Sequence, residues 1–197
     1  MIFDFILQLS ITCVLMFILY EASLKDMKYH TIEKNHVLAI MISVMIYVFV
    51  VGTSVFATVS FLITLILFGA ITLFTRGGFG FGDTIVLAFL GWFIGNPIHL
   101  QYFFFILVVI TLLWTYYMMK NNNNKINIKG KERVSVENLK PGMILANDYF
   151  MNGLTEKDII RLREEGHDYL DIKHAYPFIP VIFISFIIFL GLQGFFL

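Results

Sequence analysis

Six apolar runs divide this chain of 197 residues, and they limit what it can fold into more than any other feature. A helix needs roughly 17–25 largely apolar residues to cross the hydrocarbon core of a bilayer. Five of the runs reach or approach that length: Ile2–Tyr20, Val37–Val51, Ser54–Phe74, Leu100–Met119 and Phe178–Leu197. The remaining run, Thr84–Gly95, has 12 residues, a length that also suits a re-entrant segment. Because 58% of all residues are hydrophobic and only 14% are charged, we predict an all-α polytopic membrane protein.

The basic residues are segregated along the chain. All 14 Lys and Arg fall within Lys25–Lys34, at Arg76, or within Lys120–Lys173, and the connections 52–53 and 96–99 carry none. If all six runs cross the bilayer, the three basic segments lie on one side, which the positive-inside rule assigns to the cytoplasm. If the short fourth run did not cross, the third basic segment would lie opposite the other two. We therefore expect six transmembrane helices in the cytoplasmic (plasma) membrane, with both termini outside.

The segment 120–177 differs in composition from the rest and predicts a small cytoplasmic α+β domain. It is expected to lie between a membrane domain, 1–119, that carries helices 1–5, and a sixth transmembrane helix, 178–197. Its ten basic and nine acidic residues nearly balance, which argues against a nucleic-acid partner.

Turn and capping residues predict the elements of this small domain. Strands are expected at Arg133–Val136, Met143–Ala146 and Tyr169–Ile172. Thr155 and Asp158 have the spacing of a capping box, and the helix that they open is expected to run through Glu165, before Gly166.

A glycine-rich stretch, Arg76–Asp83, leads directly into the short fourth run. It lacks the lysine of a phosphate-binding Walker A loop, and Asp83 occupies the third-glycine position of a dinucleotide fingerprint. The five histidines form no metal-binding pair with a carboxylate at helical spacing, and no His-Glu-x-x-His or Gly-x-Ser-x-Gly motif occurs. The single cysteine, Cys13, excludes an intrachain disulfide. We expect no metal and no cofactor.

Two aspartates remain as candidates for chemistry. Asp26 lies just past the first run, and Asp83 lies at the start of the fourth, so the expected topology puts both at the cytoplasmic end of their helices. Two nearby carboxylates cannot both ionise cheaply, because each raises the proton affinity of the other. A pair that shares one proton holds a base to activate water and an acid to protonate a carbonyl oxygen. Gly80 and Gly82 would let an extended backbone approach closely.

Structural roles are alternatives for the same residues. Asp83 precedes an apolar run and suits a helix N-cap, where its charge is favourable against the helix dipole. Asp26 has lysine neighbours and suits an ordinary interfacial charge. Glu21 and Lys25 have the spacing of an i,i+4 contact on a helix surface, and Glu33 is expected to be solvated.

The segment Gly80-Phe81-Gly82-Asp83 resembles the GxGD motif of intramembrane aspartyl proteases. The segment Ala22–Asn35 resembles the first-aspartate region of the type IV prepilin peptidases, most closely the archaeal preflagellin and prepilin peptidases. This resemblance implies that Asp26 and Asp83 are the catalytic pair, and that Gly80 and Gly82 shape the backbone that holds Asp83. It also implies pilin-like or flagellin-like precursors as substrates, cleaved at the cytoplasmic face just before their hydrophobic helix.

Two departures from the family pattern bear on the function. Ile32-Glu33-Lys34-Asn35 replaces the tighter Ile-Pro-Asn of many bacterial members. The cysteine-containing N-terminal domain that accompanies N-methylation in bacterial members does not precede the first run, so we predict no methyltransferase activity. The sequence thus predicts a membrane-embedded aspartyl endopeptidase. The alternative is a non-enzymatic small transporter or assembly scaffold in which Asp83 is a helix cap or an ion site, although the chain lacks the internal repeats of many transporters.

Overall fold

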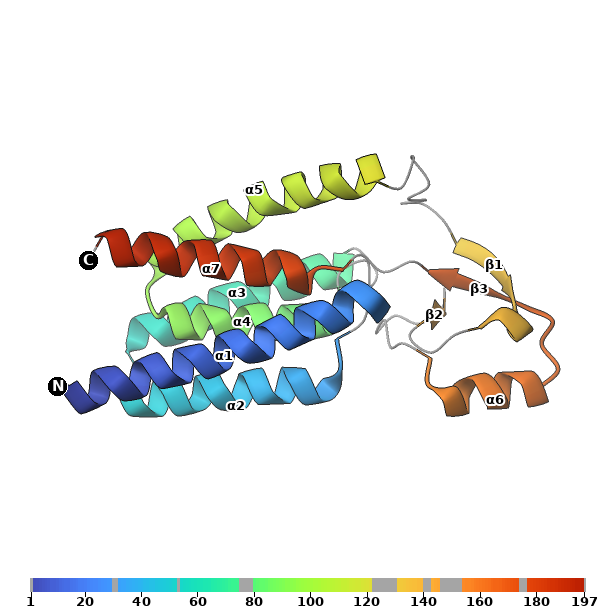
Figure 1. Cartoon of the computed structure of the whole chain (residues 1–197), viewed down its shortest axis with the longest axis horizontal. Helices are drawn as coiled ribbons and strands as arrows, with labels where there is room; N and C mark the ends of the chain where they lie inside the picture. Colours follow the sequence, from blue (N-terminus) through green and yellow to red (C-terminus); the bar gives the residue numbers. More distant parts are fainter. Residues whose placement is uncertain are drawn as a thin grey trace.

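The bulk of the chain is a bundle of helices with a small α+β domain at one end (Figure 1). The computed structural model describes residues 2–29, 32–52, 54–74, 80–121, 131–139, 143–145, 154–173 and 177–196. The bundle contains α1 (Ile2–Tyr29), α2 (Lys34–Val51), α3 (Val55–Phe74), α4 (Phe81–Ile94), α5 (Pro97–Asn121) and α7 (Ile179–Phe196). The start of α1 and the end of α7 both lie at the end of the bundle opposite the small domain (Figure 1).

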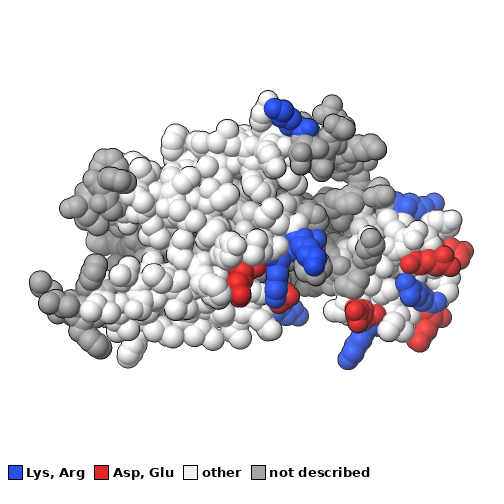
Figure 2. Space-filling model, viewed as in Figure 1, with Lys and Arg blue, Asp and Glu red and all other residues white. Residues whose placement is uncertain are grey.

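Four of the helices, α1, α2, α3 and α5, are long and apolar enough to cross a membrane. The helices α4 and α7 are apolar but shorter, over Phe81–Ile94 and Ile179–Gln193 of the described residues. On the face seen in Figure 2, charged side chains gather on the small domain and at the end of the bundle beside it, and most of the bundle shows none. This arrangement is that of a polytopic membrane protein, and the crossing of α4 and α7 stays a prediction.

The helix α1 is longer than its apolar run predicted. It continues from Tyr20 to Tyr29, so Asp26 lies within the helix and not beyond it. The residues after Tyr20 are mostly Glu, Ala, Leu, Lys and Met, which favour helix although several are polar. The buried positions of α1 recur every three or four residues on one face: Ile11, Leu15, Leu19, Ala22, Ser23 and Asp26. The last of them is a carboxylate.

The short helix α4 is covered on almost every side. It packs against α3 and α2, and most of its residues are buried. Gly91 allows the closest approach, because a Cβ there would lie 2.6 Å from Thr64 Oγ1 and 3.1 Å from the Ser60 carbonyl oxygen of α3. Small residues at helix interfaces commonly serve this purpose in membrane proteins. The helix ends at Gly95, which adopts a left-handed conformation with φ 72° and donates its N–H to the Gly91 carbonyl.

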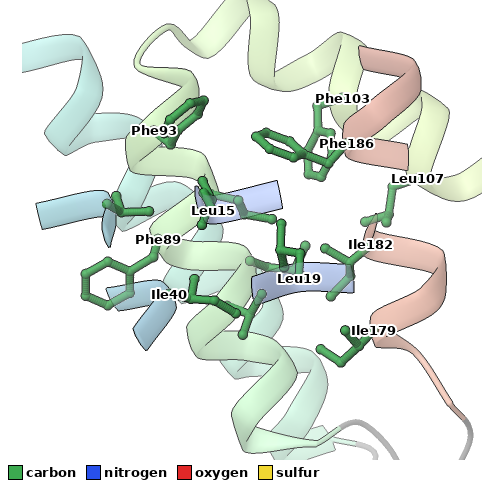
Figure 3. Packing of buried hydrophobic residues seen from close by; sticks show 14 of the residues in the cluster. Leu15, Leu19, Ile40, Phe89, Phe93, Phe103, Leu107, Ile179, Ile182 and Phe186 are labelled. Atoms are coloured by element: carbon green, nitrogen blue, oxygen red, sulfur yellow. The ribbon is translucent and has the colours of Figure 1, made fainter. Parts of the chain in front are cut away.

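Aromatic contacts connect α4 to the other half of the bundle (Figure 3). The rings of Phe93 on α4 and Phe186 on α7 meet edge to face, with centroids 5.5 Å apart. Phe186 in turn contacts Phe103 of α5, with ring planes at 89°. Edge-to-face pairs of this kind stabilise a core beyond the area that they bury. The core therefore runs continuously from α2 and α4 to α5 and α7.

The small domain is an antiparallel three-stranded sheet in the order β1-β3-β2, with one helix. Its elements are β1 (Lys131–Ser135), β2 (Ile144–Leu145), α6 (Glu156–Glu164) and β3 (Tyr169–Lys173). Its small core consists of Val136, Leu139, Leu154, Ile159 and Ile172. The sheet and helix are those that the sequence predicts, with small differences in their bounds.

Local hydrogen bonds account for these elements. Thr155 accepts the Asp158 N–H and Asp158 accepts the Thr155 N–H, so the predicted capping box is present. This bonding lowers the pKa of the Asp158 carboxyl, chiefly through the Thr155 side chain. Val136 begins a 3₁₀ turn and does not end β1, contrary to the predicted strand boundary.

Substitution of Gly91 tests the close packing of α3 and α4. We expect Gly91→Ala to lower the free energy of unfolding by about 1–3 kcal/mol, because the new methyl group meets the backbone of α3. Gly69→Ala on α3 is the matched control, since a Cβ there meets nothing within 4 Å. It should be neutral or gain up to about 1 kcal/mol of helix propensity. Thermal unfolding in detergent measures both, and equal stability of the two variants would contradict the packing argument.

Candidate active site

Asp26 is buried at the point where α1 meets the start of α7. Its side chain is 4% exposed, and Oδ2 accepts the peptide N–H of Ile179 at 2.9 Å. The peptide N–H of Phe178 is a second donor. A carboxylate buried in an apolar bundle requires such partners, and the first peptide groups of a helix offer them with a favourable dipole. Asp26 is therefore not a solvent-exposed charge, and its catalytic role stays a prediction.

Asp83 is the third residue of α4 and not its N-cap. Gly80 is the N-cap residue, with φ −67° and ψ 139°. The Asp83 carboxylate reaches back and accepts the peptide N–H of Gly80. This is the position that an acidic residue holds in the reciprocal half of a capping box. The predicted fourth run began at Thr84, and the extra turn at its start places Asp83 inside the helix.

The two glycines of the motif make room for different groups. A Cβ on Gly80 would lie 2.8 Å from Asp83 Oδ2, so the glycine leaves space for the carboxylate itself. A Cβ on Gly82 would lie 2.5 Å from Ile32 Cγ2, so this glycine leaves space for a side chain from the connection between α1 and α2. Arg76–Phe79, the rest of the glycine-rich stretch, lie outside the described residues.

The fold brings the two aspartates together although 57 positions separate them in the sequence. The charge of Asp26 acts on the carboxyl group of Asp83, so the two side chains lie within electrostatic reach of each other. The end of α1 and the start of α4 are both at the end of the bundle that faces the small domain (Figure 1). Each carboxyl group therefore affects the ionisation of the other.

Comparison with known protein families adds the chemistry to this geometry. The sequence profile of the type IV leader peptidase family matches residues 13–116, more than half of the chain, and the match includes both aspartates. The chain belongs to the type IV leader peptidase family. Comparison with curated proteins finds no match, and comparison with solved structures finds none either.

Membership in this family makes the chain a leader peptidase in general terms and confirms the family that the motifs predicted. The matched region covers α1 from Cys13, all of α2, α3 and α4, and most of α5. The small domain and α7 lie outside it. The Ile179 N–H that Asp26 accepts therefore belongs to α7, which lies outside the family match.

A contact between two threonines, one of them next to Asp83, links α4 to α3 in this leader peptidase. Thr84 is fully buried, and its Oγ1 lies 2.8 Å from Thr72 Oγ1 on α3. Thr72 also donates to the Phe68 carbonyl at 2.9 Å. This bridge holds the first turn of α4 in place beside Asp83. Sequence reasoning missed it, because a threonine at the end of an apolar run has no distinctive pattern.

An ion pair links α1 to Glu33, the residue directly before α2. Lys25 donates to Glu33 Oε2 at 2.8 Å, and His36 Nδ1 lies 3.5 Å from the same oxygen. The hydrogen bond from Lys25 lowers the pKa of the Glu33 carboxyl. Among the described residues, Lys25 thus pairs with Glu33 and not with Glu21, its expected i,i+4 partner. Glu33, expected to be solvated, is half-exposed and bonded.

Metal binding has no ready set of ligands in the part of the chain that the structure describes. Its histidine, cysteine and acidic side chains form no group of three or more that could hold an ion. The expectations of no metal and no cofactor stay predictions.

Substitution of Asp26 separates its structural bond from any chemistry. We expect Asp26→Ala to lower the free energy of unfolding by about 1–3 kcal/mol, because the buried N–H groups at the start of α7 lose their acceptor. Asp26→Asn keeps an amide oxygen in the same place and should stay close to the unsubstituted protein. Thermal unfolding in detergent measures the difference. If the Ala and Asn variants unfold at the same temperature, the bond to Ile179 does not support the fold.

Proposed function

We propose that this protein is a membrane-embedded aspartyl endopeptidase that removes leader peptides from prepilin-like or preflagellin-like precursors. Asp26 and Asp83 are its catalytic pair, and the cleavage takes place at the cytoplasmic face of the plasma membrane. One observation carries the proposal: two carboxyl groups within electrostatic reach of each other lie inside the region that matches a leader peptidase family.

The chemistry requires one carboxylate and one carboxylic acid. The carboxylate takes a proton from a water molecule, whose oxygen attacks the carbonyl carbon of the scissile peptide bond. The acid gives its proton to the carbonyl oxygen, so the tetrahedral intermediate forms without a separated charge. When the intermediate collapses, the C–N bond breaks and the leaving nitrogen takes a proton from the pair, while one hydroxyl group of the intermediate gives its proton back to the pair as the carbonyl double bond re-forms. The products are a carboxylic acid and an amine, and the pair is ready for another water molecule.

The partners of both aspartates support this use. Asp26 accepts from Ile179 and Asp83 accepts from Gly80, in each case from a peptide N–H. Peptide donors orient a carboxyl group without adding a positive charge beside it. A cationic partner would instead hold the carboxyl group in its charged form and oppose proton exchange. Two carboxyl groups held by neutral donors can trade a proton between them.

The position of the pair fits a substrate that is itself anchored in the membrane. The end of α1 and the start of α4, which carry the two aspartates, lie at the end of the bundle where charged side chains gather (Figures 1 and 2). The positive-inside rule assigns that end to the cytoplasm. A precursor whose hydrophobic helix lies in the bilayer presents the residues before that helix at the same depth. This placement assumes that α4 and α7 cross the bilayer, so that six transmembrane helices form the bundle.

Replacement of either aspartate by asparagine tests the proposal. We expect Asp26→Asn and Asp83→Asn each to abolish cleavage of a co-expressed prepilin-like or preflagellin-like precursor, because an amide can neither take nor give the proton. The loss should be at least about 100-fold, the lower range for a general acid or base. The shift of the precursor band on a gel measures cleavage, and the amount of each variant in the membrane measures insertion.

Asp171→Asn is the matched control, since Asp171 is an exposed aspartate on β3, 3.7 Å from Arg133. It should cleave at the normal rate. Normal cleavage by either Asp26→Asn or Asp83→Asn would refute the catalytic pair. If no precursor of either kind is cleaved by the unsubstituted protein, the non-enzymatic alternative, a small transporter or assembly scaffold, gains support.

A further inference from the structure

The side chain of Ile32 occupies the space that Gly82 leaves open beside the catalytic motif. Ile32 lies in the connection between α1 and α2, and its Cγ2 methyl would be 2.5 Å from a Cβ on Gly82. The side chain is partly buried and packs against the main core of the bundle. Gly82 is the residue directly before Asp83, so the contact lies one peptide unit from the second aspartate.

We propose that Ile32 is a positioning residue: its Cγ2 methyl, seated against Gly82, sets the first turn of α4 and with it the Asp83 carboxyl relative to Asp26. The inference rests on the proposed function and adds a residue that sets the geometry of the pair. Ile32 does not touch the reacting atoms. It acts through the backbone of α4.

Glu33, the residue after Ile32, is bonded through both its side chain and its backbone. Its carboxylate accepts a hydrogen bond from Lys25 of α1 at 2.8 Å. Its carbonyl accepts the His36 N–H at 3.0 Å at the start of α2. These two bonds tie the residue next to Ile32 to both helices.

A second side chain from α2 reaches the same glycine. Val37 Cγ2 would lie 3.7 Å from a Cβ on Gly82, an ordinary van der Waals contact, whereas Ile32 presses closer. The first turn of α4 thus packs against two apolar side chains, Ile32 before α2 and Val37 on α2, and Ile32 makes the closest approach.

The position of Ile32 gives the contact its effect on the pair. It follows Asp26 by six residues in the chain, and Gly82 precedes Asp83 by one. The contact between Ile32 and Gly82 therefore lies directly beside the second aspartate of the pair. Because a displacement of about 1 Å can cost about 100-fold in rate, a small change at this contact is enough to matter.

Substitutions at the two positions, separately and together, test the proposal. Gly82→Ala adds a methyl group that the Ile32 side chain excludes, and we expect kcat for precursor cleavage to fall about 100-fold with little change in KM. Ile32→Ala removes the side chain that contacts Gly82 and should also lower kcat. In the double variant the methyl group on residue 82 fills the space that Cγ2 leaves. The kcat of the double variant should therefore be at least about tenfold higher than that of Gly82→Ala, because the effects of substitutions at contacting residues are not additive.

Two further variants tell positioning from general packing. Ile32→Val keeps Cγ2 and should keep most of the activity, whereas a role in filling the core alone would give Val an effect in proportion to its lost methylene. Gly80→Ala places its methyl group 2.8 Å from Asp83 Oδ2 and away from Ile32. Adding Ile32→Ala should therefore not restore the kcat that Gly80→Ala loses. Thermal unfolding and the amount of each variant in the membrane show whether a loss in kcat comes from misfolding.

The inference is overturned if the double variant is as slow as Gly82→Ala while both are folded in the membrane, or if Gly82→Ala cleaves normally. It is also overturned if Ile32→Ala and Ile32→Val have the same kcat. These outcomes differ from failure of the proposed function, which is shown by cleavage that persists in Asp26→Asn or Asp83→Asn. If Gly82→Ala does not accumulate in the membrane, the comparison of Ile32→Ala with Ile32→Val decides.

Discussion

The burial of α4 is the constraint on which the rest of the arrangement depends. This helix has 14 residues and is apolar on all sides, so it is stable only where other helices cover it. Gly91 lets α3 approach its backbone, and Phe93 extends the packing to α7 through Phe186. Because the helix is held along its length, its first turn has a defined place at the end of the bundle. Asp83 lies in this first turn, so its position is defined as well. A longer helix with one exposed face would have more freedom to slide or rotate.

Among the described residues, peptide groups supply the hydrogen bonds to the two carboxyl groups beside the apolar core. Asp26 uses the N–H of Ile179, and Asp83 uses the N–H of Gly80. Burial of a carboxylate without donors is expensive, while a full ion pair would fix its protonation. The backbone offers donors of fixed geometry and no net charge. Because Gly80 has no Cβ, the Asp83 carboxylate has room to lie beside the backbone at the start of α4. The motif is therefore as much a packing requirement as a chemical one.

Side-chain type predicted the apolar helices and the strands and helix of the small domain, because hydropathy and capping are properties of side chains. It also offers the two aspartates as candidates, whose catalytic role stays a prediction. The apolar run stops at Tyr20 but α1 continues to Tyr29, since the polar residues that follow still favour helix. The donor at Ile179 had no sequence signal: its contribution is a peptide N–H, which every residue but proline offers, and it comes from a position 153 residues away. Ile32 was unremarkable for a similar reason, because an isoleucine near apolar helices is expected anywhere in such a chain. Asp83 was placed at the helix start, but a helix that begins at Phe81 makes it the third residue and not the cap.

The bond between Asp26 and α7 has a consequence for how the protein is made. A chain is synthesised from its N-terminus, and its earlier parts fold while later parts are still being added. Asp26 therefore enters the membrane on α1 long before Ile179 exists, and for most of synthesis its carboxylate lacks the peptide donors that it has in the finished protein. The small domain is synthesised after α5 and before α7, so α7 is made some time after α5. The site can reach its final geometry only after the last of the described helices has joined the bundle, so a nascent chain that already contains both aspartates is still an incomplete enzyme.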